Sequence, residues 1–361
     1  MRVLHLTRDL PPRIRGGIST AAGGLVDAAA LAGVDQAVVS FDGWRPRGGP
    51  SGADPVESRT ATGAPVLRIG EEAHLVAARA FAQRVAPTLV IVHHGMLFEA
   101  GRNLAGGAPV ALFAHVAQAA LSALRGLDEE TMSARAQRQA LAEAEVVWVP
   151  SEAAAALIRG TCTVLPLGIP RRTGVRRWDD RVLVVGRFDA SKGTADALAA
   201  VGEVLARRPQ TRFAFAGGLP DSRKSEERWV RRWSRAASAA EREAVDFLGW
   251  QCPQEIANLQ ASAALVLAPS HLETFGLAVL EAQLQGAIVL ASDIPAHRAL
   301  ITDGLDGLLV EAGAVMALAD RIVTALDVPP TAIRERARIA AQAAVWERRI
   351  GAHLQAWRAL G

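Results

Sequence analysis

The sequence contains no tyrosine, and only two of its 40 basic residues, Lys192 and Lys224, are lysines. Alanine, arginine, glycine and valine are abundant instead, which is typical of a GC-rich coding bias that thins out residues with AT-rich codons. Without tyrosine, the chain has no phenol that could act as acid, base or nucleophile. A lysine that escapes this bias is therefore a candidate for a functional role.

Signals for metals, disulfides and membrane spans are equally scarce. Cys162 and Cys252 lie far apart without a CxxC pair, which argues against a disulfide framework or a cysteine zinc site. His93 and His94 are adjacent, but no DxD or HExxH pattern accompanies them, so we predict no metal. No apolar run approaches the ~20 residues of a spanning helix, and residues 1–6 are too short for a signal-peptide core. The chain is expected to be cytoplasmic.

Charge is also nearly balanced. The formal net charge is +3, and the chain has neither a basic tail nor interleaved RNA-reading aromatics, so we expect no nucleic-acid partner. Two arginine-rich stretches, residues 171–177 and 228–235, are interpreted as solvated faces. Peripheral contact with the anionic inner face of a membrane stays open as an alternative.

The length of 361 residues fits two domains of about 150 to 200 residues each, with a cleft between them. Half of the residues are apolar and 21% are charged, which excludes disorder as the main state. Short apolar runs alternate with longer amphipathic stretches, so we predict an α/β chain of two doubly wound units. Residues 43–66, rich in glycine, proline and serine, are predicted to be a surface excursion. Strands are expected at residues 2–6, 36–40, 88–92, 110–114, 146–149 and 163–165, and then at 182–185, 212–215, 245–247, 264–268, 287–291 and 307–310.

The first predicted strand leads into a loop that ends in Gly16 and Gly17, just before a predicted helix. The loop lacks the GxGxxG pattern, which disfavours a dinucleotide-dependent dehydrogenase. Two glycines would let the backbone approach an anion at the helix N-terminus. A loop that needs a positive φ explains them equally well.

The strongest functional pattern is APSHLETFGLAVLE at residues 268–281, where a strand, a loop and a helix follow one another. The free amides of residues 275–277 would form an anion site that the helix dipole strengthens. Glu273 in the loop and Glu281 in the helix would accept hydrogen bonds from sugar hydroxyls, which suits a nucleotide sugar. An ordinary acidic residue near a helix N-terminus, with a solvated glutamate, is the alternative.

Three more candidates follow predicted strands. Arg187 and Lys192 lie in the loop after the strand at 182–185, and open α/β sheets bind ligands at the carboxyl ends of strands. These cations would neutralise a departing diphosphate without a metal, although a solvated surface pair is the alternative. His115 follows the strand at 110–114, where a structural histidine is the competing interpretation.

Together these residues resemble the retaining glycosyltransferases of family 4, also called glycosyl transferase group 1, which have the GT-B architecture. The resemblance covers essentially the entire chain and depends on PSHLETFGL joined to the upstream GRFDASKG. It implies two Rossmann-like domains that face an interdomain cleft. Residues 1–168, completed by a crossover helix at 343–361, would bind the acceptor, and residues 169–342 would bind the nucleotide sugar.

The resemblance also implies roles for single residues. Arg187 and Lys192 would clamp the diphosphate, Glu273 would hold the donor sugar and phosphates, and His115 would contact the sugar near the reacting carbon. These four are the expected catalytic residues. The expected substrate-binding residues are Gly16, Gly17, Gly249, Trp250, Gln251, Phe275, Gly276, Leu277 and Glu281.

In the family, Gly17 would approach the diphosphate, residues 249–251 would grip the base through backbone groups, and Glu281 would bind the ribose. The implied reaction transfers a hexose or N-acetylhexosamine from a UDP- or GDP-linked donor to the hydroxyl of a small or lipid-linked acceptor. Configuration would be retained, and no cofactor or metal would be required.

Two residues depart from the family pattern. Ala299 stands where many members carry glutamate, and Leu167 replaces the asparagine of the usual PNG turn. Both concern local hydrogen bonding more than activity. Two other functions also stay open: a catalytically silent sugar-nucleotide-binding protein, and another GT-B activity such as a sugar-nucleotide epimerase.

Overall fold

The computed structural model describes residues 1–43, 54–70, 75–127, 131–158, 160–176, 181–218 and 224–360. The chain divides into two compact units. The first unit comprises Met1–Pro170 and Trp346–Gly361, and the second comprises Arg171–Val345. The boundaries predicted from the sequence are 168/169 and 342/343. None of the described helices is both long and apolar enough to cross a membrane.

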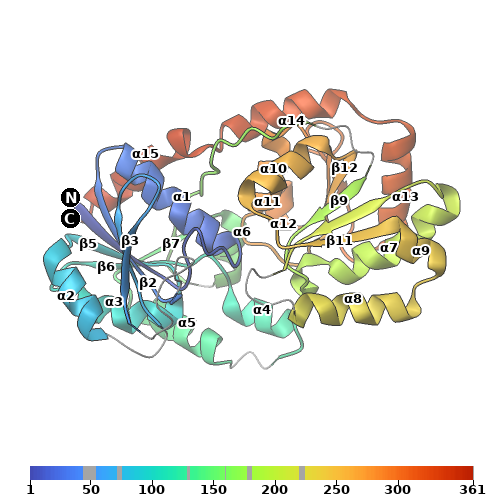
Figure 1. Ribbon diagram of the computed structural model, residues 1–361. Coiled ribbons are helices and arrows are strands. Elements are labelled where there is room, and N and C mark those ends of the chain that lie inside the picture. Colours follow the sequence, from blue (N-terminus) through green and yellow to red (C-terminus); the bar gives the residue numbers. More distant parts are fainter. Residues whose placement is uncertain are drawn as a thin grey trace. The chain divides into compact units, whose positions relative to one another are not determined.

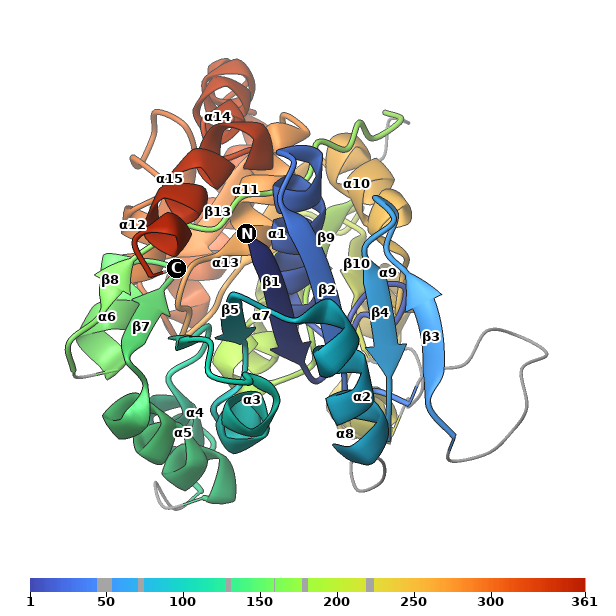
Figure 2. The same ribbon diagram turned by 90° about the vertical axis from the view of Figure 1, so that its left-hand side faces the viewer.

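The first unit is built on a sheet in the order β3-β4-β2-β1-β5-β6-β7-β8 (Figure 2). Its strands pair in parallel, except that β3 and β4 form an antiparallel hairpin at one edge. The strands are β1 (Arg2–Thr7), β2 (Asp35–Ser40), β3 (Val56–Arg59), β4 (Pro65–Arg68), β5 (Leu89–Val92), β6 (Val110–Phe113), β7 (Val146–Val149) and β8 (Thr163–Val164).

The edge hairpin corrects the prediction of a surface excursion at residues 43–66. Its described part, from residue 54 on, supplies β3 and the start of β4. Each strand has only four residues, too few to show a clear alternation among the glycines and prolines of this segment. Residues 44–53 of the segment lie outside the described residues.

Alternating side chains divide the first-unit sheet into two faces. Leu4 and Leu6 of β1 belong to the larger core, and His5 between them faces the other way. On the His5 side, helices α1 and α15 lie next to each other (Figure 1). The helices of this unit are α1 (Gly17–Leu31), α2 (Leu75–Val85), α3 (Phe98–Leu104), α4 (Gln118–Leu124), α5 (Met132–Glu143), α6 (Glu152–Ile158) and α15 (Trp346–Arg358).

Helix α15 belongs to the first unit because of its tryptophans. The indole of Trp346 lies against Gly24 of α1 and against Gly168, where a Cβ would come within 2.2 and 2.4 Å of it, respectively. Trp357, fully buried, meets His5 edge-on at a ring distance of 5.9 Å. Glycines on both sides therefore make room for a side chain that anchors the last helix.

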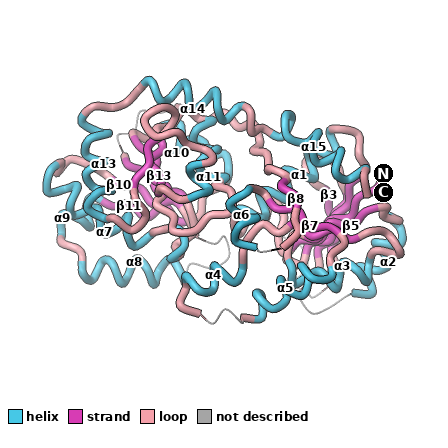
Figure 3. Tube along the Cα trace, turned by 180° about the vertical axis from the view of Figure 1, so that it is seen from behind, coloured by secondary structure: helices cyan, strands magenta, loops and turns pink. Residues whose placement is uncertain are grey.

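The second unit has an all-parallel sheet in the order β11-β10-β9-β12-β13-β14. Counted within the unit this is 3-2-1-4-5-6, the order of dinucleotide-binding folds. Val182 and Val184 pack with α7 and α13, while Leu183 between them packs toward α10 and α11 on the other face (Figure 3). The strands are β9 (Val182–Val185), β10 (Phe213–Ala216), β11 (Val245–Gly249), β12 (Leu265–Ala268), β13 (Val289–Ser292) and β14 (Leu308–Val310). The helices are α7 (Thr194–Arg207), α8 (Lys224–Ala236), α9 (Ala239–Ala244), α10 (Pro253–Ser262), α11 (Leu277–Leu284), α12 (Pro295–Arg298), α13 (Val315–Asp327) and α14 (Ala332–Gln342).

Candidate active site

The strand order of the second unit reverses between β9 and β12, which pair directly. Ligands of open α/β sheets bind beyond the carboxyl ends of the strands at such a point, because the loops there diverge to opposite faces. The loop after β9 carries Arg187 and Lys192, and the loop after β12 carries Glu273. The topology therefore brings two segments that the sequence marked separately to one edge of the sheet.

Lys192 and Glu273 form an ion pair between the two loops. The hydroxyl of Ser270 donates a second hydrogen bond to the same carboxylate oxygen, at 3.3 Å. Burial acts to raise the pKa of Glu273, but the Lys192 charge, helped by His297 and Ser270, holds it below its usual value. The side chains of Lys192 and Glu273 are still 28% and 16% exposed, so the pair is charged and accessible.

The two loops approach closely because of Gly193. Its φ is +63°, and a Cβ there would lie 1.8 Å from the carbonyl oxygen of Pro269 in the loop after β12. A similar contact joins the segments after β10 and β9, since a Cβ on Gly217 would lie 1.7 Å from the carbonyl oxygen of Gly186. Only glycine allows these backbones to pack so closely, and this fixes Lys192 beside the loop of Glu273.

Helix α11 begins beside this pair with an open N-terminus. Its N-cap, Gly276, has φ +97° and supplies no side-chain cap, and the first turn carries no acidic residue. The carbonyl of Gly276 accepts from the amides of Val279 and Leu280, which leaves the amides before them outside the helical ladder. Phe275 is 7% exposed. The amides predicted at Phe275, Gly276 and Leu277 thus lie at a helix start suited to an anion.

His297 lies next to this helix start, and the sequence analysis missed it. Its Nδ1 donates to the carbonyl oxygen of Ser292 at 2.9 Å, and burial lowers its pKa. The neutral ring then carries its lone pair on Nε2, which is buried and has no hydrogen-bond partner among the described residues. Nε2 lies 4.0 Å from where a Cβ on Gly276 would be. A histidine within HRALITDG carries no local signal, because its role depends on how β13 and α12 place it beside α11.

Two further predicted residues lie on the same elements: Glu281 on α11 and Arg187 in the loop after β9. The carboxylate of Glu281, partly buried on α11, makes no hydrogen bond or ion pair with any described residue. Burial raises its pKa to about 7, against the opposing charge of Arg172. The side chain of Arg187 is exposed.

The segment predicted to hold the base ends β11. Gly249 has φ +68°, and its carbonyl already accepts from the amide of Gly217 at 2.9 Å. The side-chain amide of Gln251 donates to the carbonyl of Leu248 at 2.7 Å, and Trp250 is partly buried. This loop is tied to itself and to β10, so any base contact would come from its remaining backbone groups.

In the first unit, His115 is the end of a chain of hydrogen bonds through buried imidazoles. Its Nε2 lies 2.8 Å from Nδ1 of His93, whose Nε2 lies 3.0 Å from Nδ1 of His5. At its other end, this series of hydrogen bonds reaches the side-chain oxygen of Gln36, 2.7 Å from Nε2 of His5. Both ring nitrogens of His93 are engaged, and no group of three metal-binding side chains occurs among the described residues. His5 and Gln36 were not predicted, because their role depends on strand pairing.

Gly16 and Gly17 begin α1. Gly16 has φ 168°, which is extended backbone, and neither glycine lies in the left-handed region that favours glycine. The alternative that this loop needs a positive φ is therefore wrong. Helix α1 also starts without a side-chain cap or an acidic residue in its first turn. Its N-terminus has the same open character as that of α11.

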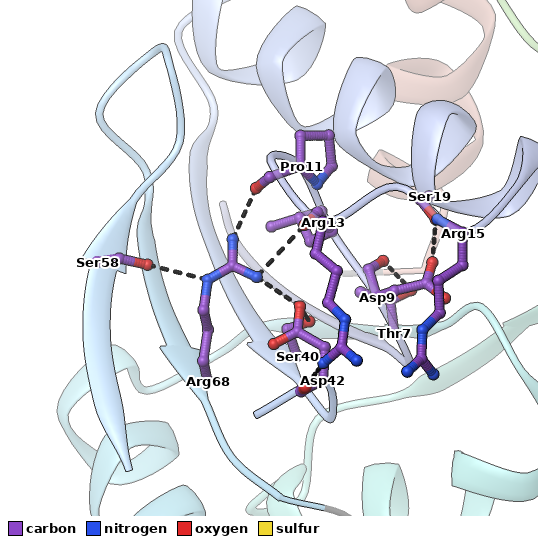
Figure 4. Close-up of polar contacts among 11 residues, drawn as sticks. Thr7, Asp9, Pro11, Arg13, Arg15, Ser19, Ser40, Asp42, Ser58 and Arg68 are labelled. Atoms are coloured by element: carbon purple, nitrogen blue, oxygen red, sulfur yellow. Dashed lines mark hydrogen bonds and ion pairs between the residues drawn. The ribbon is translucent and has the colours of Figure 1, made fainter. Parts of the chain in front are cut away.

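A buried polar cluster holds the loop before α1 in place (Figure 4). Arg68 of β4 pairs with Asp42 at 2.5 Å and donates to the carbonyl of Pro11 at 2.6 Å. The hydroxyl of Ser19 donates to the carboxylate of Asp9. Burial raises the pKa of Asp9, which the hydrogen bond of Ser19 partly offsets. The edge hairpin missed in the sequence thus supplies the arginine that positions this loop.

Comparison with known proteins follows the division into two units. Residues 169–346 match the model of the family described as glycosyl transferases group 1. A D-inositol 3-phosphate glycosyltransferase of Corynebacterium diphtheriae is 33% identical over 167 residues, which are 46% of this chain and 37% of that enzyme. In such matches the chain spans a little over a third of the length of its curated relatives.

Solved structures resemble the whole chain. A sucrose-phosphate synthase from Thermosynechococcus elongatus matches with a TM-score of 0.79 and 20% identity, over 100% of this chain and 99% of that one. Anabaena HepE in complex with UDP and glucose matches with a TM-score of 0.73 and 18% identity, over 98% and 99%. At such identities the likeness shows the fold alone, and it confirms two Rossmann-like α/β units of the GT-B type. Residues 169–346 are thus similar to glycosyl transferases group 1, and the whole chain has the GT-B fold.

Proposed function

We propose that the protein is a glycosyltransferase that takes a hexose or N-acetylhexosamine from a nucleoside-diphosphate sugar. The observation that carries the proposal is the Lys192–Glu273 pair beside the uncapped start of α11, at the strand-order reversal of the second unit. The match of this unit to glycosyl transferases group 1 supports it. Membership of family 4, retention of configuration, a UDP- or GDP-linked donor and independence from metals are parts of the same proposal.

The donor diphosphate would bind the first amides of α11, where the helix dipole favours negative charge. Lys192 would then exchange the carboxylate of Glu273 for a phosphate oxygen, because its flexible, 28% exposed side chain can move from one anion to another. Glu273, released from the lysine, would accept hydrogen bonds from sugar hydroxyls. As the bond to the sugar breaks, the growing charge on the diphosphate would be met by groups already in place. Arg187 would join only when the donor arrives.

Glu281 would take the ribose. Its carboxylate has no partner among the described residues, and burial raises its pKa to about 7. Two hydroxyl donors from a ribose would stabilise the ionised form and lower that pKa again. Gly249, Trp250 and Gln251 would contact the base.

The first unit would bind a hydroxyl acceptor, either a small molecule or a lipid-linked one, with at most peripheral membrane contact. Gly16 and Gly17 at the start of α1 would approach the diphosphate, and His115 would contact the sugar. The catalytic set is then His115, Arg187, Lys192 and Glu273.

The experiment has two stages. Thermal-shift measurements with UDP, GDP, ADP and dTDP identify the base, because only a nucleotide that binds the folded state raises its melting temperature. Incubation of the matching nucleotide sugars with a panel of alcohols then detects free nucleoside diphosphate and glycoside, and NMR assigns the product anomer. Stabilisation without release of nucleoside diphosphate would leave a silent sugar-nucleotide-binding protein. No stabilisation by any nucleotide would overturn the proposal.

A further inference from the structure

Gln36 is held in one orientation at the start of the histidine chain. Its side-chain nitrogen donates to the carbonyl oxygens of Val34 and Asp35, both at 3.2 Å. A flipped amide would point its oxygen at two other oxygens, so the nitrogen belongs where it is. The amide oxygen of Gln36 therefore faces Nε2 of His5, at 2.7 Å.

This oxygen sets the direction of every hydrogen bond that follows. Because an amide oxygen only accepts, Nε2 of His5 carries the proton and its Nδ1 carries the lone pair. Nδ1 of His5 must then accept from Nε2 of His93, and Nδ1 of His93 from Nε2 of His115. Each step follows from the rule that a neutral imidazole has one donor and one acceptor.

The rings are neutral because they are buried together. His5, His93 and His115 are 0%, 1% and 5% exposed. Burial lowers the pKa of His5 to about 4 and that of His115 to about 3. Burial also lowers the pKa of His93 well below its usual value, and the neighbouring histidines add to the effect. Each ring has a single proton at neutral pH.

Strand order makes the chain continuous. β2, β1, β5 and β6 are successive neighbours in the first-unit sheet. Gln36 lies on β2, His5 on β1, His93 directly after β5 and His115 shortly after β6. The line runs obliquely across the sheet, from the beginning of one strand to beyond the end of another.

We propose that Gln36, His5 and His93 are positioning residues that fix the tautomer of His115, with the proton on Nε2 and the lone pair on Nδ1. In this tautomer Nδ1 of His115, a buried atom, can only accept a hydrogen bond. His115 takes a hydrogen bond from a hydroxyl of the sugar or acceptor and gives none to a phosphate or carbonyl oxygen. The assignment of a sugar contact to His115 rests on the proposed function, whereas the tautomer itself does not.

The tautomer is measured on the full chain, without any ligand, by long-range ¹H–¹⁵N NMR at pH 7.5 with labelled histidine. We expect a protonated Nε2 and an unprotonated Nδ1 for His5, His93 and His115. An Nδ1-protonated His115, or an imidazolium in the chain, would overturn the inference even if transfer is observed.

Gln36→Met removes the anchor while keeping the side-chain volume, and we expect His115 to become a mixture of tautomers. Gln260→Met is the matched control, a fully buried glutamine of the second unit whose side-chain nitrogen donates to the carbonyl of Ala278 at 3.4 Å. It should leave the His115 signals in their original form. A fixed Nε2–H tautomer in folded Gln36→Met would show that Gln36 does not set the direction.

A second readout uses donor and acceptor analogues in which single hydroxyls are replaced by fluorine, which cannot donate. For the hydroxyl at His115 we expect at least a roughly tenfold loss of kcat/KM in the wild type. This loss should shrink in Gln36→Met, because the other tautomer presents an N–H to the fluorine in place of a lone pair that repels it. Equal discrimination in both proteins would contradict the role in specificity. If no transfer occurs at all, the proposed function fails, and the NMR result stands by itself.

Discussion

At the residue scale, the ion pair with Glu273 holds Lys192 in place until an anionic ligand can replace the carboxylate. Its partner Glu273 is charged because Lys192 is there, and Gly193 directly after it brings both loops together. A lysine serves this position well, since its compact ammonium on a flexible stem can move from carboxylate to phosphate.

Lys192→Ala should lower turnover by about a hundredfold or more, because losing one donor to a developing charge typically costs about 2.7 to 4 kcal/mol. Steady-state kinetics with the donor found by thermal shift provide the measurement. Arg207→Ala is the control, since Arg207 forms an exposed ion pair with Asp320 and donates to the carbonyl of Glu203 in its own helix, so turnover should change less than about twofold. Unchanged turnover in Lys192→Ala would refute the role of this lysine.

We expect Glu281 to lower the stability of the protein at neutral pH while it strengthens nucleotide binding. Its pKa rises from 4.5 to about 7 on folding, so the folded state loses stability as the pH rises between these values. Glu281→Gln should therefore raise the free energy of unfolding at pH 8 by up to about 3 kcal/mol, and by little at pH 4. Urea unfolding at both pH values measures this.

The same Glu281→Gln variant should bind the nucleotide more weakly, since a carboxylate accepts two ribose hydroxyls better than an amide does. Glu203→Gln, at an exposed position on α7, is the control and should alter neither property. A stability difference that does not depend on pH would contradict the assignment of the titration to Glu281.

At the scale of elements, the loops after β9 and β12 depend on one backbone contact. Gly193→Ala should destabilise the protein by well over 1 kcal/mol, because a positive φ costs an alanine about that much and its Cβ meets Pro269 as well. Gly304→Ala matches the φ, at +74°, but would meet nothing within 4 Å. Chemical denaturation of both variants separates the cost of the positive φ from the cost of the contact with Pro269. Equal losses would mean that the loops have room to adjust.

The strands could be predicted from the sequence better than the contacts between side chains of different strands and loops. Each predicted strand is present within two residues, because buried parallel strands are short apolar runs between amphipathic helices. The hairpin of β3 and β4 was not predicted, since its short strands lie at an edge of the sheet. Lys192 and Glu273 stood out through local motifs, whereas His5, Gln36 and His297 depend on strand register and loop packing that no short pattern encodes.

At the scale of the whole molecule, the first unit is discontinuous. It comprises residues 1–170 and, after the second unit in the sequence, the segment 346–361 that contains α15. A chain that ends at Val345 would leave the cavity of Trp346 beside Gly24 and Gly168 empty, and would uncover His5 where Trp357 lies. We expect the first unit to lose most of its stability and the second to keep its own.

Hydrogen exchange followed by mass spectrometry tests this truncation unit by unit. Amides of β1 and β2 should exchange much faster than in the full chain, and those of β9 and β12 should keep their protection. Uniform loss of protection in both units would instead mean that their stabilities are coupled.

The helix that closes the first unit is also the last part of the chain described here to be synthesised. During translation, β1 to β8 emerge first but wait without α15, whereas every element of the second unit leaves the ribosome in one uninterrupted stretch. The first unit therefore cannot complete its fold until every element of the second unit has been synthesised. A nascent chain would keep the histidine-bearing face of the first unit uncovered for as long as the second unit takes to be made.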